Sequence, residues 1–218
     1  MMNTNILGNE KSLLNQFVAE LRDENIQTDS MRFRRNLERV GEIFAYEISK
    51  MLQYEEKQVV TPLGISTIEL PAERPVLATI LRAGLPLHQG LLNYFDTADN
   101  SFISAFRKYS KDGSFHIELE YISCPNLENR TLILCDPMLA TGSSIILAYQ
   151  ALLSNGMPKH VHIVTVVASK EGIKNIQKNI DTRNVTIWAA AVDEELTVKS
   201  YIVPGIGDAG DLAYGSKI

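Results

Sequence analysis

The clearest pattern in the chain begins at Pro75, where short apolar runs alternate with stretches of helical periodicity. The apolar runs predict strands at residues 76–81, 102–106, 132–135, 161–167 and 185–191. The stretches between them predict helices at residues 87–94, 144–155 and 171–179. Strands that are apolar on both faces and separated by helices indicate a parallel sheet covered on both sides. We therefore predict an α/β fold with a central, mostly parallel sheet flanked by helices.

Two further elements are expected upstream of this alternating core. Apolar residues at spacings of three and four predict an amphipathic helix that begins after an N-cap at Asp29 or Ser30 and extends to Met51. Two β-rich runs, residues 58–61 and 65–70, flank a Pro/Gly turn and predict a hairpin. The first 30 residues predict a short helix and an extended arm. We treat residues 1–218 as a single domain with a hairpin arm at about residues 54–72.

Composition places the chain among ordinary globular proteins, with 218 residues of which 45% are hydrophobic. The net charge of −5 argues against broad nucleic-acid binding, which needs a basic surface. Cys124 and Cys135 form no CxxC pair, so neither a zinc site nor a disulfide is expected. The sequence shows neither a signal peptide nor an apolar run of about 18 residues. We expect a cytoplasmic protein that does not interact with membranes.

Unusual residues follow three of the predicted strands, and in such sheets ligands bind at the carboxyl ends of the strands. Asp136 follows the strand at residues 132–135, and Thr141 to Ser144 lead directly into a helix. Unpaired N–H groups and the helix dipole favour an anion there. The hydroxyls add donors, and a carboxylate accepts hydrogen bonds from a sugar diol. These residues suit a ribose 5-phosphate, although a capped helix after a strand remains the alternative on these residues alone.

The nine-residue segment that starts at Asp136 resembles the phosphoribosyl-diphosphate-binding loop of type I phosphoribosyltransferases, in the form typical of their uracil branch. The resemblance covers most of the chain. It includes residues 80–85, which are similar to the pyrophosphate loop, and residues 106–125, which are similar to the flexible loop. Residues 201–211 closely match the uracil-binding segment. Several long motifs in the family's order make a chance similarity untenable.

The resemblance implies roles for individual residues. Catalysis falls to Arg82, Asp136 and Asp208, and no side chain is assigned to a metal. Arg82 and Arg107 would contact the diphosphate from two sides, because guanidinium groups match phosphate oxygens. The remaining residues implied to bind phosphoribosyl diphosphate are Asp136, Pro137, Met138, Leu139, Ala140, Thr141, Gly142, Ser143, Ser144 and Asp208.

The C-terminal segment formally matches G-x-G-x-x-G at residues 205–210. A dinucleotide fold needs a helix and an acidic residue about 20 positions later, and only eight residues follow Gly210, so we reject that interpretation. Rigid backbone donors and acceptors can instead match the alternating N–H and C=O groups of uracil. The resemblance implies a base-binding hood at about residues 192–218. Its implied uracil-binding residues are Tyr201, Ile202, Gly207, Asp208 and Ala209.

The implied activity is conversion of uracil and 5-phospho-α-D-ribose 1-diphosphate to UMP and diphosphate in pyrimidine salvage. Mg²⁺, chelated mainly by the substrate's diphosphate and sugar oxygens, is the expected cofactor. A homodimer or higher homo-oligomer is expected. Some relatives are activated by GTP, and the sequence leaves open whether this chain is. The alternatives are a phosphoribosyltransferase for another base, a non-catalytic pyrimidine-sensing regulator that binds RNA, and a catalytically silent paralogue.

The chain departs from the family pattern at a few positions. Ser143 stands where a glycine is usual, and a positive φ there would strain a serine. Gln89 replaces a usual aspartate, and Leu212 replaces a basic residue. None of these changes removes a direct ligand on this assignment.

Overall fold

The computed structural model describes the backbone of residues 3–109 and 115–216, with side chains except at residues 105–109 and 115–118. Its main sheet has the strand order β1-β10-β9-β7-β4-β5-β6, and β8 also pairs with β9. All neighbours are parallel except β5 and β6. The bounds are β1 (Asn3–Ile6), β4 (Val76–Leu81), β5 (Asp99–Tyr109), β6 (Phe115–Ser123), β7 (Thr131–Cys135), β8 (Met138–Leu139), β9 (His160–Ser169) and β10 (Val185–Asp193).

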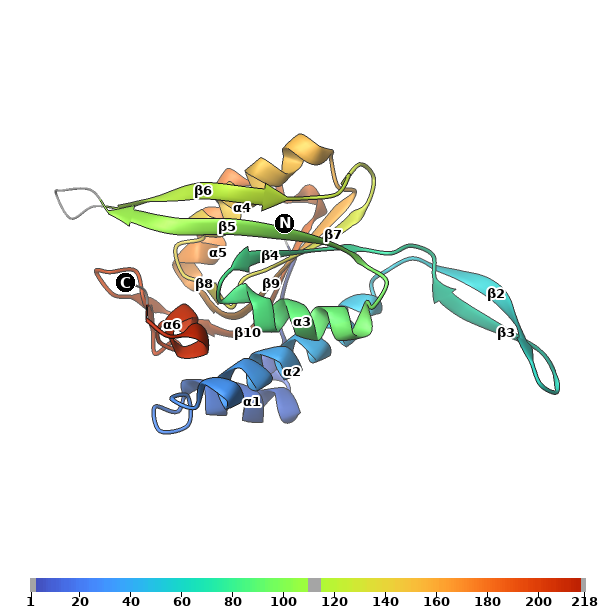
Figure 1. Cartoon of the computed structure of the whole chain (residues 1–218), viewed down its shortest axis with the longest axis horizontal. Helices are drawn as coiled ribbons and strands as arrows, with labels where there is room; N and C mark the ends of the chain where they lie inside the picture. Colours follow the sequence, from blue (N-terminus) through green and yellow to red (C-terminus); the bar gives the residue numbers. More distant parts are fainter. Residues whose placement is uncertain (1–2, 110–114, 217–218) are drawn as a thin grey trace.

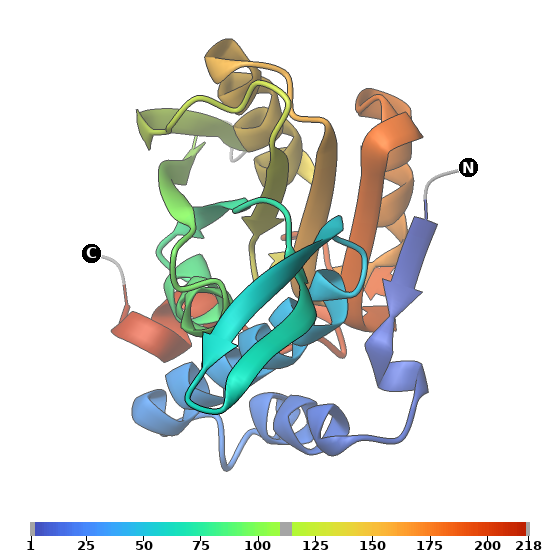
Figure 2. The same ribbon diagram turned by 90° about the vertical axis from the view of Figure 1, so that its right-hand side faces the viewer.

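Helices cover both faces of this sheet (Figures 1 and 2). One face carries α1 (Leu13–Arg22), α2 (Ser30–Ser49) and α3 (Gly84–Tyr94), and the other carries α4 (Ser143–Leu152) and α5 (Lys170–Asn179). The central strand β7 shows why its sequence is continuously apolar. Its alternate side chains enter the two different hydrophobic cores, so no position faces solvent. The α/β prediction is therefore confirmed.

The predicted core strands and helices are all present, with small differences at their ends. Asp29 caps α2 by accepting a hydrogen bond from the Arg32 N–H. Three features were not predicted from the sequence. The N-terminal arm forms β1, which joins the sheet edge beside β10. The predicted strand at residues 102–106 is longer, and it pairs with β6, which apolar patterning did not identify.

The predicted hairpin consists of β2 (Tyr54–Thr61) and β3 (Gly64–Pro71), and it is longer than the pattern indicated. It projects from the body of the protein, at the opposite end from α6 (Ala209–Tyr214) in Figure 1. Several of its apolar side chains are exposed, including Val60 at 84% and Leu63 at 100%. A two-stranded ribbon with apolar side chains in water is a poor independent unit, so this surface is suited to contact with a partner.

The C-terminal part packs beside the carboxyl edge of the sheet. It comprises the small antiparallel pair β11 (Glu195–Leu196) and β12 (Ile202–Val203), followed by α6. Ile202 and Ala209 are buried in the same core as α1 and α2, which anchors this part to the sheet. Among the described residues, every helix is too short or too polar to span a bilayer.

Candidate active site

The segment after β7 forms a loop at the carboxyl edge of the sheet and ends where α4 begins, at Ser143. The Asp136 N–H donates to the Val164 carbonyl (3.0 Å), which continues the pairing of β7 with β9. The Pro137 carbonyl accepts from Val166 (3.1 Å). Asp136 is thereby delivered to the sheet edge, and its carboxylate is partly exposed.

Gly142 is the N-cap of α4 and has a φ of 80°, which is the left-handed region that favours glycine. The turn therefore depends on Gly142 and not on Ser143, which is the first helical residue. Ser143 is not among the residues with positive φ, so the strain considered for a serine at this position does not arise.

The hydroxyls of the loop lie together at the start of α4. The Thr141 hydroxyl donates to Ser143 Oγ (3.0 Å) and accepts from the Ser143 N–H (3.4 Å). Thr141, Ser143 and Ser144 are all partly exposed, so the first turn of α4 remains accessible to a ligand. Anions bind such helix starts because the backbone N–H groups there have no partner within the helix.

The carbonyl side of the same loop rests against the first two turns of α5. Ser169 Oγ donates to the Ala140 carbonyl (2.5 Å), and Asn175 Nδ2 donates to the Thr141 carbonyl (2.8 Å). A Cβ added to Gly172 would lie 2.4 Å from the Ala140 oxygen, so only glycine permits this approach. Sequence analysis assigned no such role to Ser169 or Asn175, because their contacts join segments about 30 residues apart.

Arg82 follows β4, the neighbour of β7 in the sheet, and the Leu81–Arg82 peptide bond is cis. Its Nη2 donates to Asp211 Oδ1 (3.2 Å) and to the Gly215 carbonyl (3.1 Å). The side chain is 38% exposed. The guanidinium thus lies at the carboxyl edge and already contacts acceptor oxygens of the C-terminal part.

Asp208 caps α6, and its Oδ1 accepts from the N–H groups of Gly210 (3.0 Å) and Asp211 (3.1 Å). Its Oδ2 accepts from the Tyr201 hydroxyl (3.4 Å). A Cβ added to Gly210 would lie 3.3 Å from Asp208 Oδ1 and 3.8 Å from Arg82 Nη2. Asp208 and Arg82 therefore flank the same glycine, although 126 positions separate them in the sequence.

The loop before α6 is tied to the body of the protein by Arg22, which sequence analysis did not identify. Arg22 forms a two-pronged ion pair with Asp193 (2.8 Å for each contact) and donates to the Gly205 carbonyl (2.9 Å). Asp193 also accepts from the Gly205 N–H (2.9 Å). Because Asp193 is only 7% exposed, this network holds the loop firmly at the end of β10.

The structure brings most of the sequence-predicted residues to one edge of the sheet. The loop of Asp136 to Ser144, Arg82, Tyr201 and Asp208 all lie there. Ile202 is 5% exposed and its side chain packs in the core, so that side chain is not available to a ligand. The backbone of Arg107 lies in β5, but its side chain is outside the described residues.

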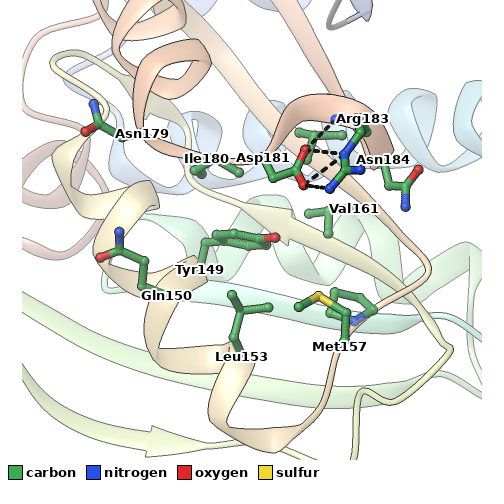
Figure 3. A pocket seen from close by; sticks show the side chains of 12 residues that line it. Tyr149, Gln150, Leu153, Met157, Val161, Asn179, Ile180, Asp181, Arg183 and Asn184 are labelled. Atoms are coloured by element: carbon green, nitrogen blue, oxygen red, sulfur yellow. Dashed lines mark hydrogen bonds and ion pairs between the residues drawn. The ribbon is translucent and has the colours of Figure 1, made fainter.

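A separate cavity lies near the amino ends of β9 and β10, between the ends of α4 and α5 (Figure 3). It has Tyr149 and Leu153 on one side and the Asp181–Arg183 ion pair on its rim. None of the sequence-predicted site residues lines it. Ligands of open α/β sheets bind at the carboxyl ends of the strands, so we place the active site at the opposite edge.

Neither the buried thiol of Cys135 nor any group of metal-ligating side chains among the described residues gives a second site. Burial raises the pKa of the Cys135 thiol to about 12, so this cysteine stays protonated, as expected for a buried free thiol. Within the part of the chain that the structure describes, no three His, Cys, Asp or Glu side chains are grouped so that they could hold a metal ion.

A parallel sheet that carries an aspartate, a Thr-Gly-Ser-Ser helix start and an arginine at its carboxyl edge defines the class of type I phosphoribosyltransferases. A solved hypoxanthine phosphoribosyltransferase from Staphylococcus aureus has the same fold, with a TM-score of 0.50 at 13% identity over 75% of this chain and 76% of that chain. The sequence profile described as "Uracil phosphoribosyltransferase" matches residues 8–216. The chain belongs to the uracil phosphoribosyltransferase family.

Individual relatives agree with this placement. A uracil phosphoribosyltransferase of Porphyromonas gingivalis is 55% identical over 97% of this chain and 98% of its own length. Another, of Thermococcus gammatolerans, is 40% identical over 93% of this chain and 89% of its own. A solved protein structure from Aquifex aeolicus superimposes with a TM-score of 0.85 at 30% identity, over 99% of both chains.

Proposed function

We propose that this chain is a uracil phosphoribosyltransferase, which converts uracil and 5-phospho-α-D-ribose 1-diphosphate to UMP and diphosphate. The observation that carries the proposal is the family match over residues 8–216, which includes both the loop after β7 and the turn after β4. An enzyme with uracil and phosphoribosyl diphosphate as substrates would act in pyrimidine salvage.

We assign the 5-phosphate to the start of α4 and the ribose diol to Asp136. The loop of Thr141 to Ser144 offers N–H groups and hydroxyls, which are the donors that a phosphate monoester requires. Asp136 begins the same loop, five positions before Thr141. A carboxylate can accept hydrogen bonds from both hydroxyls of a diol.

We assign the diphosphate to Arg82, with Arg107 from a second side. Arg82 contacts the Asp211 carboxylate and the Gly215 carbonyl, two oxygens that a diphosphate would replace as acceptors. Its position beside β7 supports this role, because the diphosphate and the 5-phosphate are attached to the same ribose and their binding groups must lie close together.

We assign uracil recognition to the hood at about residues 192–218, through the backbone of Ile202 and of Gly207 to Ala209, with Tyr201 shaping the pocket. Gly207 is exposed and has a φ of 74°, and the Arg22–Asp193 network holds the preceding Gly205 in place. A rigid backbone can present fixed donors and acceptors to the edge of a base.

The chemistry follows from this arrangement. Diphosphate leaves the anomeric carbon as uracil N1 approaches, and the sugar passes through an oxocarbenium-like state. The chain contributes mainly by positioning the reactants and by stabilising charge on the leaving group through Arg82. Asp208, which flanks Gly210 together with Arg82 and accepts from the Tyr201 hydroxyl, acts electrostatically and not as a general base.

The site suits Mg²⁺ carried by the substrate. Mg²⁺ in such sites keeps several waters and uses one or two carboxylates together with phosphate oxygens, so it needs no all-protein cage. Asp136 and Asp208 supply hard oxygen donors at this edge of the sheet and would contact the ion directly or through water. When bound, Mg²⁺ would neutralise charge on the departing diphosphate.

We also propose that the protein is a homodimer or higher homo-oligomer in the cytoplasm. The exposed apolar side chains of the β2–β3 hairpin support self-association, and the free cysteines Cys124 and Cys135 fit a reducing compartment.

The direct test is an assay of the purified protein with uracil, phosphoribosyl diphosphate and Mg²⁺, in which UMP formation is measured by chromatography. Parallel reactions with hypoxanthine and adenine serve as controls. UMP formation with uracil supports the proposal. Transfer to a purine in preference to uracil, or no transfer to any base, would contradict it.

A further inference from the structure

The side of the phosphate loop that faces away from solvent rests on α5, and one side chain of α5 contacts the loop backbone directly. Asn175 Nδ2 donates to the Thr141 carbonyl at 2.8 Å, and Asn175 is partly buried. We propose that Asn175 is a positioning residue that orients the loop for binding the 5-phosphate of phosphoribosyl diphosphate. This inference rests on the proposed function of the loop.

The geometry of the peptide bond explains how a contact to a carbonyl can orient a donor. In a trans peptide the C=O and the following N–H point in opposite directions. The peptides on either side of Thr141 are not among the cis bonds. When Asn175 holds the Thr141 carbonyl toward α5, the Gly142 N–H must point away from α5. The Ser169 hydroxyl has the same effect on the Ala140 carbonyl and the Thr141 N–H.

The amide of Asn175 is itself oriented by a neighbour on α5. Asn179 Nδ2 donates to Asn175 Oδ1 (2.7 Å) and to the Asn175 carbonyl (2.9 Å). Because Oδ1 of Asn175 is occupied as an acceptor, its NH₂ group is the end that faces Thr141. This gives a chain of contacts from Asn179 through Asn175 to the loop.

The loop also packs closely against the backbone and apolar side chains of α5. A Cβ added to Gly142 would lie 3.1 Å from the Gly172 carbonyl and 3.4 Å from Ile176 Cγ1, so the loop sits directly on α5. Since Gly142 has a φ of 80°, few conformations of the loop satisfy both the turn and the helix. Asn175 supplies the polar contact that selects among them, because an amide donor can satisfy the Thr141 carbonyl and an apolar side chain cannot.

The principal variant is Asn175→Leu, which has a similar volume but no donor. We expect its KM for phosphoribosyl diphosphate to rise about 5- to 20-fold, the effect of losing one hydrogen bond that orients a binding loop. Its KM for uracil and its melting temperature should remain close to those of the wild type. The Kd for phosphoribosyl diphosphate with Mg²⁺, measured by calorimetry without uracil, should rise by the same factor.

Two further variants make the test decisive. Asn179→Ala lies at an exposed position and should raise the same KM by a smaller factor, because it only frees the Asn175 amide to rotate. Gln177→Ala removes an exposed amide of the same helix and should behave as wild type in every measurement.

An unchanged KM for phosphoribosyl diphosphate in Asn175→Leu, with an active wild type, would overturn the proposal. A parallel rise in both KM values together with a lower melting temperature would also overturn it, since that pattern marks a merely structural role. A wild type that neither binds phosphoribosyl diphosphate nor forms UMP would instead overturn the proposed function, so the two failures are distinguishable.

Discussion

At the scale of single residues, the site depends on side chains whose partners lie far away in the sequence. Arg82 contacts Asp211 and Gly215, and Asp208 contacts Tyr201. These contacts place a cation and a carboxylate on either side of Gly210. Each has a chemical role that a substitution can test.

Arg82→Ala and Asp136→Asn should each lower kcat/KM with little loss of stability. Removal of one charge-assisted contact costs about 1.5–3 kcal/mol, which corresponds to roughly 10- to 200-fold. Steady-state kinetics with uracil and thermal unfolding measure the two quantities. Arg183→Ala, which removes an exposed ion pair near the amino edge, is the matched control. Activity close to wild type in both active-site variants would rule out the assigned roles.

A buried histidine should make stability depend on pH. Burial and the neighbouring His160 lower the pKa of His162 to about 3, and its Nδ1 accepts from Trp188 Nε1 at 3.0 Å, which requires that nitrogen to be unprotonated. Below pH 6.5 the unfolded chain binds a proton that the folded chain does not. The free energy of unfolding should therefore fall as the pH decreases from 6.5 toward 3, by up to about 1.4 kcal/mol per pH unit for this group.

Urea unfolding at pH 7 and pH 5 tests this dependence. His162→Gln keeps an acceptor for Trp188 but does not titrate, so its stability should decrease less than that of the wild type between the two pH values. Equal decreases in the two proteins would show that His162 does not contribute.

At the scale of secondary-structure elements, the hairpin and the helices serve different purposes. The helices cover the sheet and position loops, whereas β2 and β3 form a separate two-stranded ribbon with several exposed apolar side chains. The hairpin projects away from the active-site edge (Figure 1). Changes in it should therefore affect assembly before they affect chemistry.

We expect the hairpin to act as an arm across a two-fold dimer interface. Replacing exposed apolar residues with like charges, as in Val60→Glu with Leu63→Glu, should shift the protein toward monomer, because charged groups are costly to bury without partners. Light scattering coupled to size exclusion measures the mass. The double substitution Glu55→Gln with Lys57→Gln, on the same hairpin, is the control. A monomeric wild type at the working concentration would contradict the prediction.

At the scale of the whole molecule, the C-terminal part, to which we assign uracil recognition, is joined to the sheet by contacts between distant segments. Arg22 of α1 joins Asp193 at the end of β10 to Gly205 in the uracil segment. These contacts fix the segment relative to the sheet, and on our assignment they would hold base and sugar at a set distance.

The wild type should prefer uracil to cytosine by roughly 30- to 10⁴-fold in kcat/KM. Cytosine presents an amino group where uracil has a carbonyl, and an unprotonated nitrogen where uracil has N–H. Two mismatched contacts, at about 1–3 kcal/mol each, account for this range. Comparison of the two bases in the wild type is a cleaner test than Gly207→Pro. Gly207 has a φ of 74°, so proline would change the loop as well as remove an N–H. A ratio near one would contradict backbone recognition.

The sequence alone determined the alternation of strands and helices, the cap at Asp29, and the loops that carry Asp136 and Arg82. These features are local, because periodicity and helix starts depend on residues within a few positions of one another. It did not determine that Asn3–Ile6 joins the sheet, that Gly142 and not Ser143 takes the left-handed conformation, or that Arg22 and Asn175 support the site. Those features depend on contacts between segments tens of residues or more apart, and only the packed tertiary structure decides which distant donors and acceptors meet.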